Sequence, residues 1–150
     1  MTALSFRPAR PDDHGRITAV MDQWWGRPVH ASLPRLFLDH FHQTSTVVED
    51  GGELAGFLVA FLSPSEPDAA YIHFVGVHPD LRGAGLARTL YTRFFDTVRA
   101  AGRTKVSAVT APVNQRSIAF HTAMGFTVAS VPDYDGPGVD RVAFHLELAP

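Results

Sequence analysis

The stretch from residue 75 to residue 88 has residue types and a spacing suited to binding a phosphate group. An apolar strand runs into His78-Pro79-Asp80, which ends the strand because proline fixes φ and disfavours a helix at the preceding residue. Gly83 and Gly85 then allow the backbone to approach a ligand closely. An amphipathic helix follows, so the unpaired N–H groups of its first turn are predicted to attract an anion.

Two familiar phosphate-binding motifs do not fit this stretch. The dinucleotide fingerprint needs a small residue at its third glycine position, and Arg88 stands there. The nucleoside-triphosphate loop needs Gly-Lys-Ser or Gly-Lys-Thr, and neither tripeptide occurs in the chain. An ordinary glycine turn that enters a helix is the structural alternative.

The pattern R-x-x-G-x-A, at Arg82, Gly85 and Ala87, resembles motif A of the GCN5-related N-acetyltransferase (GNAT) family. In that family the loop wraps the pyrophosphate of acetyl-CoA. A second pattern resembles the family's motif B and reads Asn114-x-x-Ser117-x-x-Phe120-His121-x-x-x-Gly125-Phe126. The resemblance is sharpest between residues 70 and 126, whereas the first 65 residues match only in the order of their elements.

The resemblance implies acetyl-CoA as the acyl donor. The backbone of the strand before the loop is expected to bond the pantetheine arm and the acetyl carbonyl, and the loop to bond the pyrophosphate. The residues implied for acetyl-CoA are Val75, Gly76, Val77, Arg82, Gly83, Ala84, Gly85, Leu86, Ala87, Arg88, Asn114 and Ser117. Asn114 is also a favourable helix N-cap, and the alternative for each arginine, stronger for Arg88 than for Arg82, is a solvated surface residue.

Acyl transfer from a thioester to an amine requires a neutral amine and a proton for the departing thiolate. His121 stands where the family usually has tyrosine as the general acid, and its alternative is a packed helix histidine bonded to a carbonyl. His73 shares one strand face with Tyr71 and Val75, where it could act as a base or hold a water. Its alternative is a core histidine satisfied by hydrogen bonds. Residues 107–110, where some relatives carry a glutamate base, hold no carboxylate.

The acceptor pocket is expected on the elements that family members use for it, the first two helices and the last hairpin. Asp135 could hold an ammonium group, and Trp24 or Trp25 could pack against its stem. The alternatives are tryptophans in the core and an ordinary Asp135-Gly136 turn. The candidate acceptor residues are Trp24, Trp25, Arg27, Phe37, Tyr71, Tyr134 and Asp135.

The predicted elements alternate between strands and helices. The first strand spans 4–8, and a helix that begins near 11–13 ends at the loop 24–28. Further helices are expected at about 33–41, from 86 to the glycine C-cap at 102, and at 114–124. Further strands are expected at 46–49, 53–62, 70–77, 106–109, 126–131 and 139–148, with a hairpin turn at 50–52.

This order, β-α-α-β-β-β-α-β-α-β-β, is the order that the GNAT family shows. The predicted fold class is therefore α/β (α+β), a GNAT fold with a mixed central sheet of six to seven strands and flanking helices. Residues 1–150 are expected to form a single GNAT acetyltransferase domain, because this length suits one domain with a sizeable core.

The amino-acid composition limits the classes of partner and of site that the chain is expected to have. The chain is 45% hydrophobic and 19% charged, as globular proteins are, and its net charge of -2 gives no reason to expect nucleic acid or an anionic membrane. It has no cysteine, which excludes disulfides, thiolate zinc sites and a cysteine nucleophile. No metal site is expected, since His40 and His42 point to different helix faces. With no apolar run in 1–10 and no apolar stretch of about 20 residues, the expected location is the cytoplasm.

These observations favour an acetyl-CoA-dependent N-acetyltransferase that acts on a primary amine of a small molecule or peptide. Transfer is expected to be direct, within a ternary complex. Two alternatives remain open: a catalytically degenerate member that binds acyl-CoA as a sensor, and an interaction domain without a cofactor. A homodimer is a further implication, since members of the family are often dimers.

Overall fold

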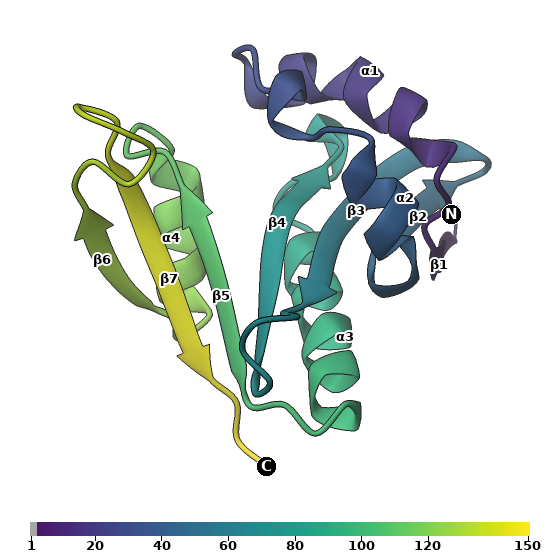
Figure 1. The fold of residues 1–150 in the computed structure, drawn as a ribbon. Helices are drawn as coiled ribbons and strands as arrows, with labels where there is room; N and C mark the ends of the chain where they lie inside the picture. Colours follow the sequence, from purple (N-terminus) through teal and green to yellow (C-terminus); the bar gives the residue numbers. More distant parts are fainter. Residues whose placement is uncertain (1–2) are drawn as a thin grey trace. The chain divides into compact units, whose positions relative to one another are not determined.

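A computed structural model describes residues 3–150, so residues 1–2 of the predicted domain lie outside it (Figure 1). The described chain contains the strands β1 Leu4–Pro8, β2 Thr46–Asp50, β3 Glu53–Leu62, β4 Ala69–Val77, β5 Lys105–Thr110, β6 Thr127–Val131 and β7 Arg141–Glu147. It also contains the helices α1 Asp13–Trp25, α2 Leu36–Phe41, α3 Leu86–Ala100 and α4 Gln115–Ala123. The predicted class and order of elements are confirmed. None of the described helices is long and apolar enough to span a bilayer.

The chain divides into two compact units. The first contains residues up to 61 together with 72–97, and the second contains 62–71 together with 98–150. The expectation of a single domain stays a prediction.

The first unit contains an antiparallel meander. Its strands are in the order β1-β2-β3-β4, with β1 antiparallel to β2 and β2 antiparallel to β3. The turn between β2 and β3 is formed by Gly51 and Gly52, at φ 59° and 88°. Positive φ at both central residues is what a two-residue hairpin turn of type I′ requires, which explains the Asp-Gly-Gly sequence.

Helices α1 and α3 cover opposite faces of this sheet. Phe57 of β3 packs against Trp24 and Trp25 of α1, with ring centroids 5.9 and 6.1 Å away. At the neighbouring Gly56, a Cβ would lie 3.2 Å from Leu86 of α3. Adjacent strand residues point to opposite faces, so the two helices must cover opposite sides of β3.

The helix α3 buries one apolar stripe, as expected of an amphipathic helix. Leu86, Leu90, Phe94 and Val98 are each at most 5% exposed. Fully burying side chains of this kind stabilises a protein by about 1.5–3 kcal/mol each. On the α1 side, the core contains Ala9, Ile17, Met21, Trp24, Val29, Leu33, Leu38, Val47, Phe57 and Val59.

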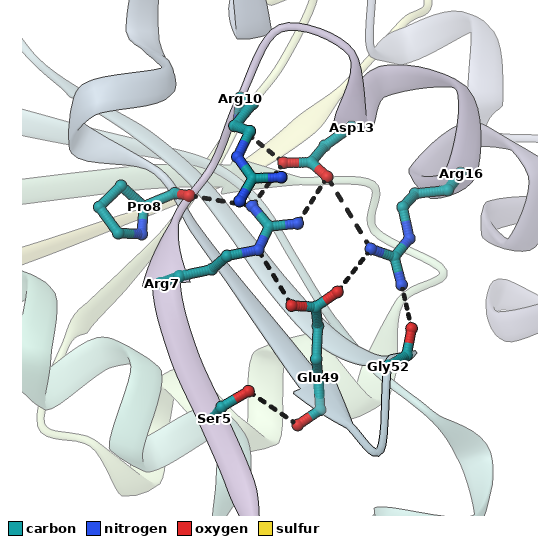
Figure 2. Close-up of polar contacts among 8 residues, drawn as sticks. All are labelled: Ser5, Arg7, Pro8, Arg10, Asp13, Arg16, Glu49 and Gly52. Atoms are coloured by element: carbon teal, nitrogen blue, oxygen red, sulfur yellow. Dashed lines mark hydrogen bonds and ion pairs between the residues drawn. The ribbon is translucent and has the colours of Figure 1, made fainter.

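A network of charged side chains anchors the start of α1 to β1 and β2 (Figure 2). Arg7 donates to both carboxylate oxygens of Asp13, at 2.9 and 2.8 Å, and to Glu49 at 3.0 Å. Arg16 donates to the other oxygen of Glu49 at 2.8 Å. Burial alone would raise the pKa of Asp13, but the hydrogen bonds from Arg7 and from the backbone N–H of Arg10 hold that pKa below its ordinary value.

The second unit contains β5, β7 and β6 in that spatial order. Both pairs are antiparallel, with Ala108 of β5 opposite Phe144 of β7, and Phe144 opposite Val128 of β6. The helix α4 is capped at its start by Asn114, whose side chain accepts a hydrogen bond from the Ser117 N–H. That cap agrees with the alternative role given to Asn114 from its sequence.

The predicted second helix begins later than expected. A 3-10 turn occupies His30–Ser32, and α2 begins only at Leu36 rather than near residue 33. The reason is Pro34, which disfavours helical backbone at Leu33 and has no N–H to donate.

Candidate functional site

The turn between β4 and α3 leads into a helix start whose first N–H groups lack acceptors within the helix. Residues 82–85 are exposed, and Gly83 and Gly85 have φ of 85° and 82°, which side-chain-bearing residues rarely adopt. The first hydrogen bond of α3 runs from the Thr89 N–H to the Gly85 carbonyl, at 3.0 Å. The N–H groups of residues 86–88 therefore have no acceptor within the helix and lie at the positive end of its dipole.

The two arginines predicted near the phosphate differ in their surroundings. Arg82 donates a hydrogen bond to the backbone carbonyl of Trp24, which ties the turn to the end of α1. Arg88 is exposed on the first turn of α3. The guanidinium of Arg82 thus has a structural contact of its own.

Packing requires a glycine at position 76 of β4. A Cβ at this position would lie 2.6 Å from the ring of Phe57 and 3.0 Å from Trp25. The carbonyl of Gly76 in turn would lie 3.0 Å from a Cβ at Gly56. The strand end predicted to bind pantetheine, residues 75–77, is therefore held against β3 and α1 by a contact that only glycine allows.

The predicted base His73 lies against α2 within the first unit. Its Nε2 donates to the carbonyl of Ser32 at 2.7 Å, because a carbonyl can only accept. The ring stacks on Phe37, with centroids 4.0 Å apart and planes at 7°. Burial lowers the pKa of His73, and the bond to Ser32 only partly offsets this. The ring is thus neutral near pH 7 and carries its lone pair on Nδ1.

The aromatic residues predicted for the acceptor surround the same sheet face. Trp24 is 5% exposed and stacks on Phe57. Trp25 is half-buried and meets Phe74 edge-on, with centroids 5.5 Å apart. Both tryptophans therefore serve the core, and the part of Trp25 that remains exposed is available to a ligand.

In the second unit, Asn114 and Ser117 lie at the start of α4. The Asn114 side chain accepts from the Ser117 N–H at 3.2 Å and donates to Thr110 Oγ1 at 3.1 Å. The Ser117 hydroxyl lies 3.3 Å from His121 Nδ1. These bonds fix the helix start and orient both polar side chains.

The predicted general acid His121 is packed in the core of the second unit. It is 3% exposed and stacks on Phe144, with centroids 3.9 Å apart and planes at 2°. Its Nδ1 donates to the carbonyl of Ser117 at 2.8 Å. Burial lowers the pKa of His121, partly offset by that bond. These contacts favour the packing alternative, and the acid role stays a prediction.

The last hairpin brings Tyr71, Tyr134 and Asp135 together with a residue that sequence reasoning missed, Arg141. Its Nε donates to Asp135 at 2.5 Å, so the carboxylate predicted to hold an ammonium already has a cationic partner. Burial raises the pKa of Tyr71 to about 12, and charges at Tyr134 and Asp135 act in the same direction. The signal in the sequence was an arginine directly after the turn that contains Asp135.

The predicted site residues thus fall into two groups. The first unit contains Trp24, Trp25, Arg27, Phe37, His73, Val75, Gly76, Val77, Arg82, Gly83, Ala84, Gly85, Leu86, Ala87 and Arg88. The second unit contains Tyr71, Asn114, Ser117, His121, Tyr134 and Asp135. Among residues 3–150, no group of three or more His, Cys, Asp or Glu side chains is placed to hold a metal ion.

The fold and the glycine turn define an acetyltransferase-like protein, and comparison with known families agrees. The model of the acetyltransferase (GNAT) family matches residues 8–126. The chain belongs to this family.

Individual relatives are similar to this chain in sequence over part of its length. The L-2,4-diaminobutyric acid acetyltransferase of Virgibacillus pantothenticus is 35% identical over 79 residues, which are 53% of this chain and 50% of that protein. The L-amino acid N-acyltransferase of Escherichia coli K12 is 40% identical over 80 residues, 51% of this chain and 46% of that protein. The chain spans about half the length of these curated relatives.

Among solved structures, yncA from Salmonella typhimurium, determined with its cofactor acetyl-CoA, superimposes with a TM-score of 0.73. It is 25% identical, and the match covers 99% of this chain and 95% of that one. The predicted GNAT fold is therefore confirmed over nearly the whole chain.

Proposed function

We propose that this chain is an acetyl-CoA-dependent N-acetyltransferase that moves the acetyl group directly to a primary amine. The observation that carries the proposal is the exposed turn at residues 82–85, followed by the start of α3 and its N–H groups without helical acceptors. Such a helix start is suited to a pyrophosphate. Membership of the family, and the acetyl-CoA bound to the Salmonella relative, support acetyl-CoA as the ligand.

Within the proposal, the chain holds acetyl-CoA mainly through its backbone. The strand end 75–77 bonds the pantetheine arm and the acetyl carbonyl, and residues 82–88 bond the pyrophosphate. The polar contacts that the resemblance implies for Asn114 and Ser117, in the second unit, stay a prediction. Since donors fixed by the fold need no reorganisation, they can also stabilise the oxyanion that forms during transfer.

His73 is the proposed base. Its lowered pKa keeps the ring neutral at pH 7, and its Nε2–H is committed to Ser32. The Nδ1 lone pair can then accept the proton of the amine, directly or through a water. The stack on Phe37 fixes the plane of the ring and therefore the direction of that lone pair.

The proposed acceptor is an amine that also carries a carboxylate. The named substrates of both relatives, L-2,4-diaminobutyric acid and L-amino acids, belong to this class. In the second unit, Arg141 uses Nε for Asp135, and its two terminal nitrogens are suited to a carboxylate. A panel of amines tests this proposal: L-2,4-diaminobutyrate should be acetylated faster than 1,3-diaminopropane, which lacks the carboxylate.

The burial of His121 supports a second candidate, a catalytically degenerate acyl-CoA sensor, because a packed ring cannot easily serve as the acid. Calorimetric titration with acetyl-CoA, followed by mass spectrometry over the amine panel, separates the candidates. Binding with transfer supports the enzyme, and binding without transfer to any amine supports the sensor. No binding of acetyl-CoA contradicts both.

A further inference from the structure

A pocket of about 610 Å³ lies beside α1 within the first unit. It contains none of the residues proposed for acetyl-CoA and only Trp24 of those predicted for the acceptor. A volume of this size accommodates a small organic molecule. The lining residues are Arg16, Ala19, Val20, Gln23, Trp24, Glu53, Leu54, His78, Pro79 and Asp80.

The single arginine of the lining is already neutralised. Arg16 donates to Glu49 at 2.8 Å and to the carbonyl of Gly52 at 3.0 Å, and it lies 4.0 Å from Asp13 (Figure 2). Two carboxylates thus surround this guanidinium outside the pocket. An anionic ligand would have to compete with both of them, so the pocket does not favour an anion.

The two carboxylates of the lining, by contrast, form no ion pair with an arginine or a lysine among residues 3–150. Glu53 is exposed and forms no ion pair among residues 3–150. Asp80 lies 3.9 Å from His78 Nδ1, but that nitrogen accepts a hydrogen bond from the Asp80 N–H at 3.0 Å. Because this nitrogen accepts the Asp80 N–H, it does not also donate a hydrogen bond to the Asp80 carboxylate.

The rest of the lining is apolar. Ala19 and Val20 of α1, Leu54 of β3 and the edge of Trp24 supply a hydrocarbon surface between the polar groups. A metal ion would not use this surface, and the described residues offer no cluster of three metal ligands here. We propose that this is an effector pocket for an alkylammonium ligand, whose charge is bound by Glu53 and Asp80 and whose aliphatic stem lies on the apolar wall.

The pocket borders the turn that is proposed to bind the pyrophosphate. His78, Pro79 and Asp80 lead directly into that turn, and the carbonyl of Trp24 accepts a hydrogen bond from Arg82. The ring of Trp24 also meets His78 edge-on, with centroids 5.5 Å apart. A cation bound here adds positive charge beside the site of an anion, so it should strengthen the binding of coenzyme A. This coupling rests on the proposed function, whereas the binding of the ammonium does not.

The test uses n-butylammonium as the probe and the full chain without acetyl-CoA, so that no turnover occurs. In a titration followed by amide NMR shifts, the largest shifts should fall on residues 19–20, 53–54, 78 and 80, since Pro79 has no amide N–H. The double variant Glu53→Gln/Asp80→Asn should weaken binding at least about threefold, as expected for exposed charge pairs. The control Glu66→Gln removes an exposed carboxylate of the second unit and should leave the affinity unchanged.

Coupling is then measured with coenzyme A, which has no acetyl group to transfer. Saturating n-butylammonium should lower the Kd of coenzyme A at least about twofold, and coenzyme A should lower the Kd of n-butylammonium by the same factor. Shifts centred elsewhere, or unchanged affinity in the double variant, overturn the pocket. Binding at the pocket without reciprocal coupling overturns its role as an effector site. Failure of coenzyme A to bind contradicts the proposed function. The pocket is then tested by the titration with n-butylammonium alone.

Discussion

At the scale of residues, burial lowers the pKa of two histidines, the half-buried His73 and the buried His121. His73 and His121 each donate one ring N–H to a backbone carbonyl and stack on a phenylalanine. The sequence identified both as unusual polar residues. It could not distinguish their settings, since the partners Ser32 and Phe144 are distant in sequence and are brought near only by the fold.

For His73, we expect His73→Phe to remove the acidic limb of the pH profile of kcat/KM. The ring stacks on Phe37 in either case, so packing is largely retained while the base is lost. Because burial lowers the pKa of His73, the limb should lie below the ordinary value of 6.5. A pH series with the best acceptor found provides the measurement, and an unchanged acidic limb would show that the base lies elsewhere.

For His121, we expect His121→Phe to make stability less dependent on pH. The unfolded chain titrates near 6.5, while burial lowers the pKa in the folded chain, so the unfolded state binds more protons in acid. The contribution of His121 is complete above about pH 6.5 and declines as the pH falls toward the folded pKa. Urea unfolding at about pH 7 and about pH 5 measures the difference.

The same variant tests the acid role of His121. If the ring protonates the thiolate, kcat should fall by at least about tenfold where chemistry is rate-limiting. Retained kcat, together with the shallower pH dependence, would assign the ring to packing. As a control, the exposed His40→Gln should change neither quantity.

At the scale of elements, the features that depend on local sequence could be predicted. The features that depend on contacts between distant segments could not. The bounds of β1 and β3 and the buried stripe of α3 follow from periodicity and turn residues within each segment. The start of α2 lies later than expected because Pro34 disfavours helical backbone at the residue before it. The packing of Gly76 depends on which distant segments meet, and a single sequence does not contain that information, whereas the Asp135–Arg141 pair lies within one hairpin.

Gly76 joins β4 to β3 and α1, so we expect Gly76→Ala to lower the free energy of unfolding by about 1–3 kcal/mol. The added Cβ would lie 2.6 Å from Phe57, whose ring is fully buried and packs against both tryptophans. Urea unfolding provides the measurement. The control Gly15→Ala lies in α1 with nothing within 4 Å of its Cβ, and it should stabilise the chain by about 0.5–1 kcal/mol. An unchanged stability of Gly76→Ala would contradict the close packing.

The ion network of Figure 2 joins α1 to two strands, so we expect Asp13→Asn to cost about 3 kcal/mol. Asp13 is 4% exposed, and its loss leaves Arg7 partly uncompensated. Since the pKa of Asp13 is lowered by folding, this stabilisation is present above the ordinary value of 3.8 and is lost as the pH falls through the folded pKa. The exposed pair Arg35–Asp39 gives the control, and Asp39→Asn should cost less than about 1 kcal/mol. Equal costs for the two variants would show that burial of the network contributes nothing.

At the scale of the whole molecule, the expectation of a single domain becomes a question of cooperativity. Both tryptophans lie in the first unit, so tryptophan fluorescence reports on that unit alone, while far-ultraviolet circular dichroism reports on both. If the chain unfolds as one domain, the two signals should give the same midpoint. Separate midpoints would show two independently unfolding units.

The binding of coenzyme A tests whether the chain unfolds as one domain, and it also tests whether the turn at residues 82–85 binds the pyrophosphate. At about 100 times its Kd, a ligand that binds only the folded state adds about 2.7 kcal/mol to the free energy of unfolding, and in a single cooperative domain both signals should shift equally.

Ala84→Glu places a negative charge in the exposed turn without the backbone strain that a side chain at Gly85 would create. We expect this variant to weaken coenzyme A binding about tenfold, or about 1.4 kcal/mol, whereas Ala84→Gln should bind as the wild type does. Equal affinities of these two variants would mean that the pyrophosphate does not bind at this turn, and a shift in fluorescence alone would mean that the second unit folds independently of the ligand.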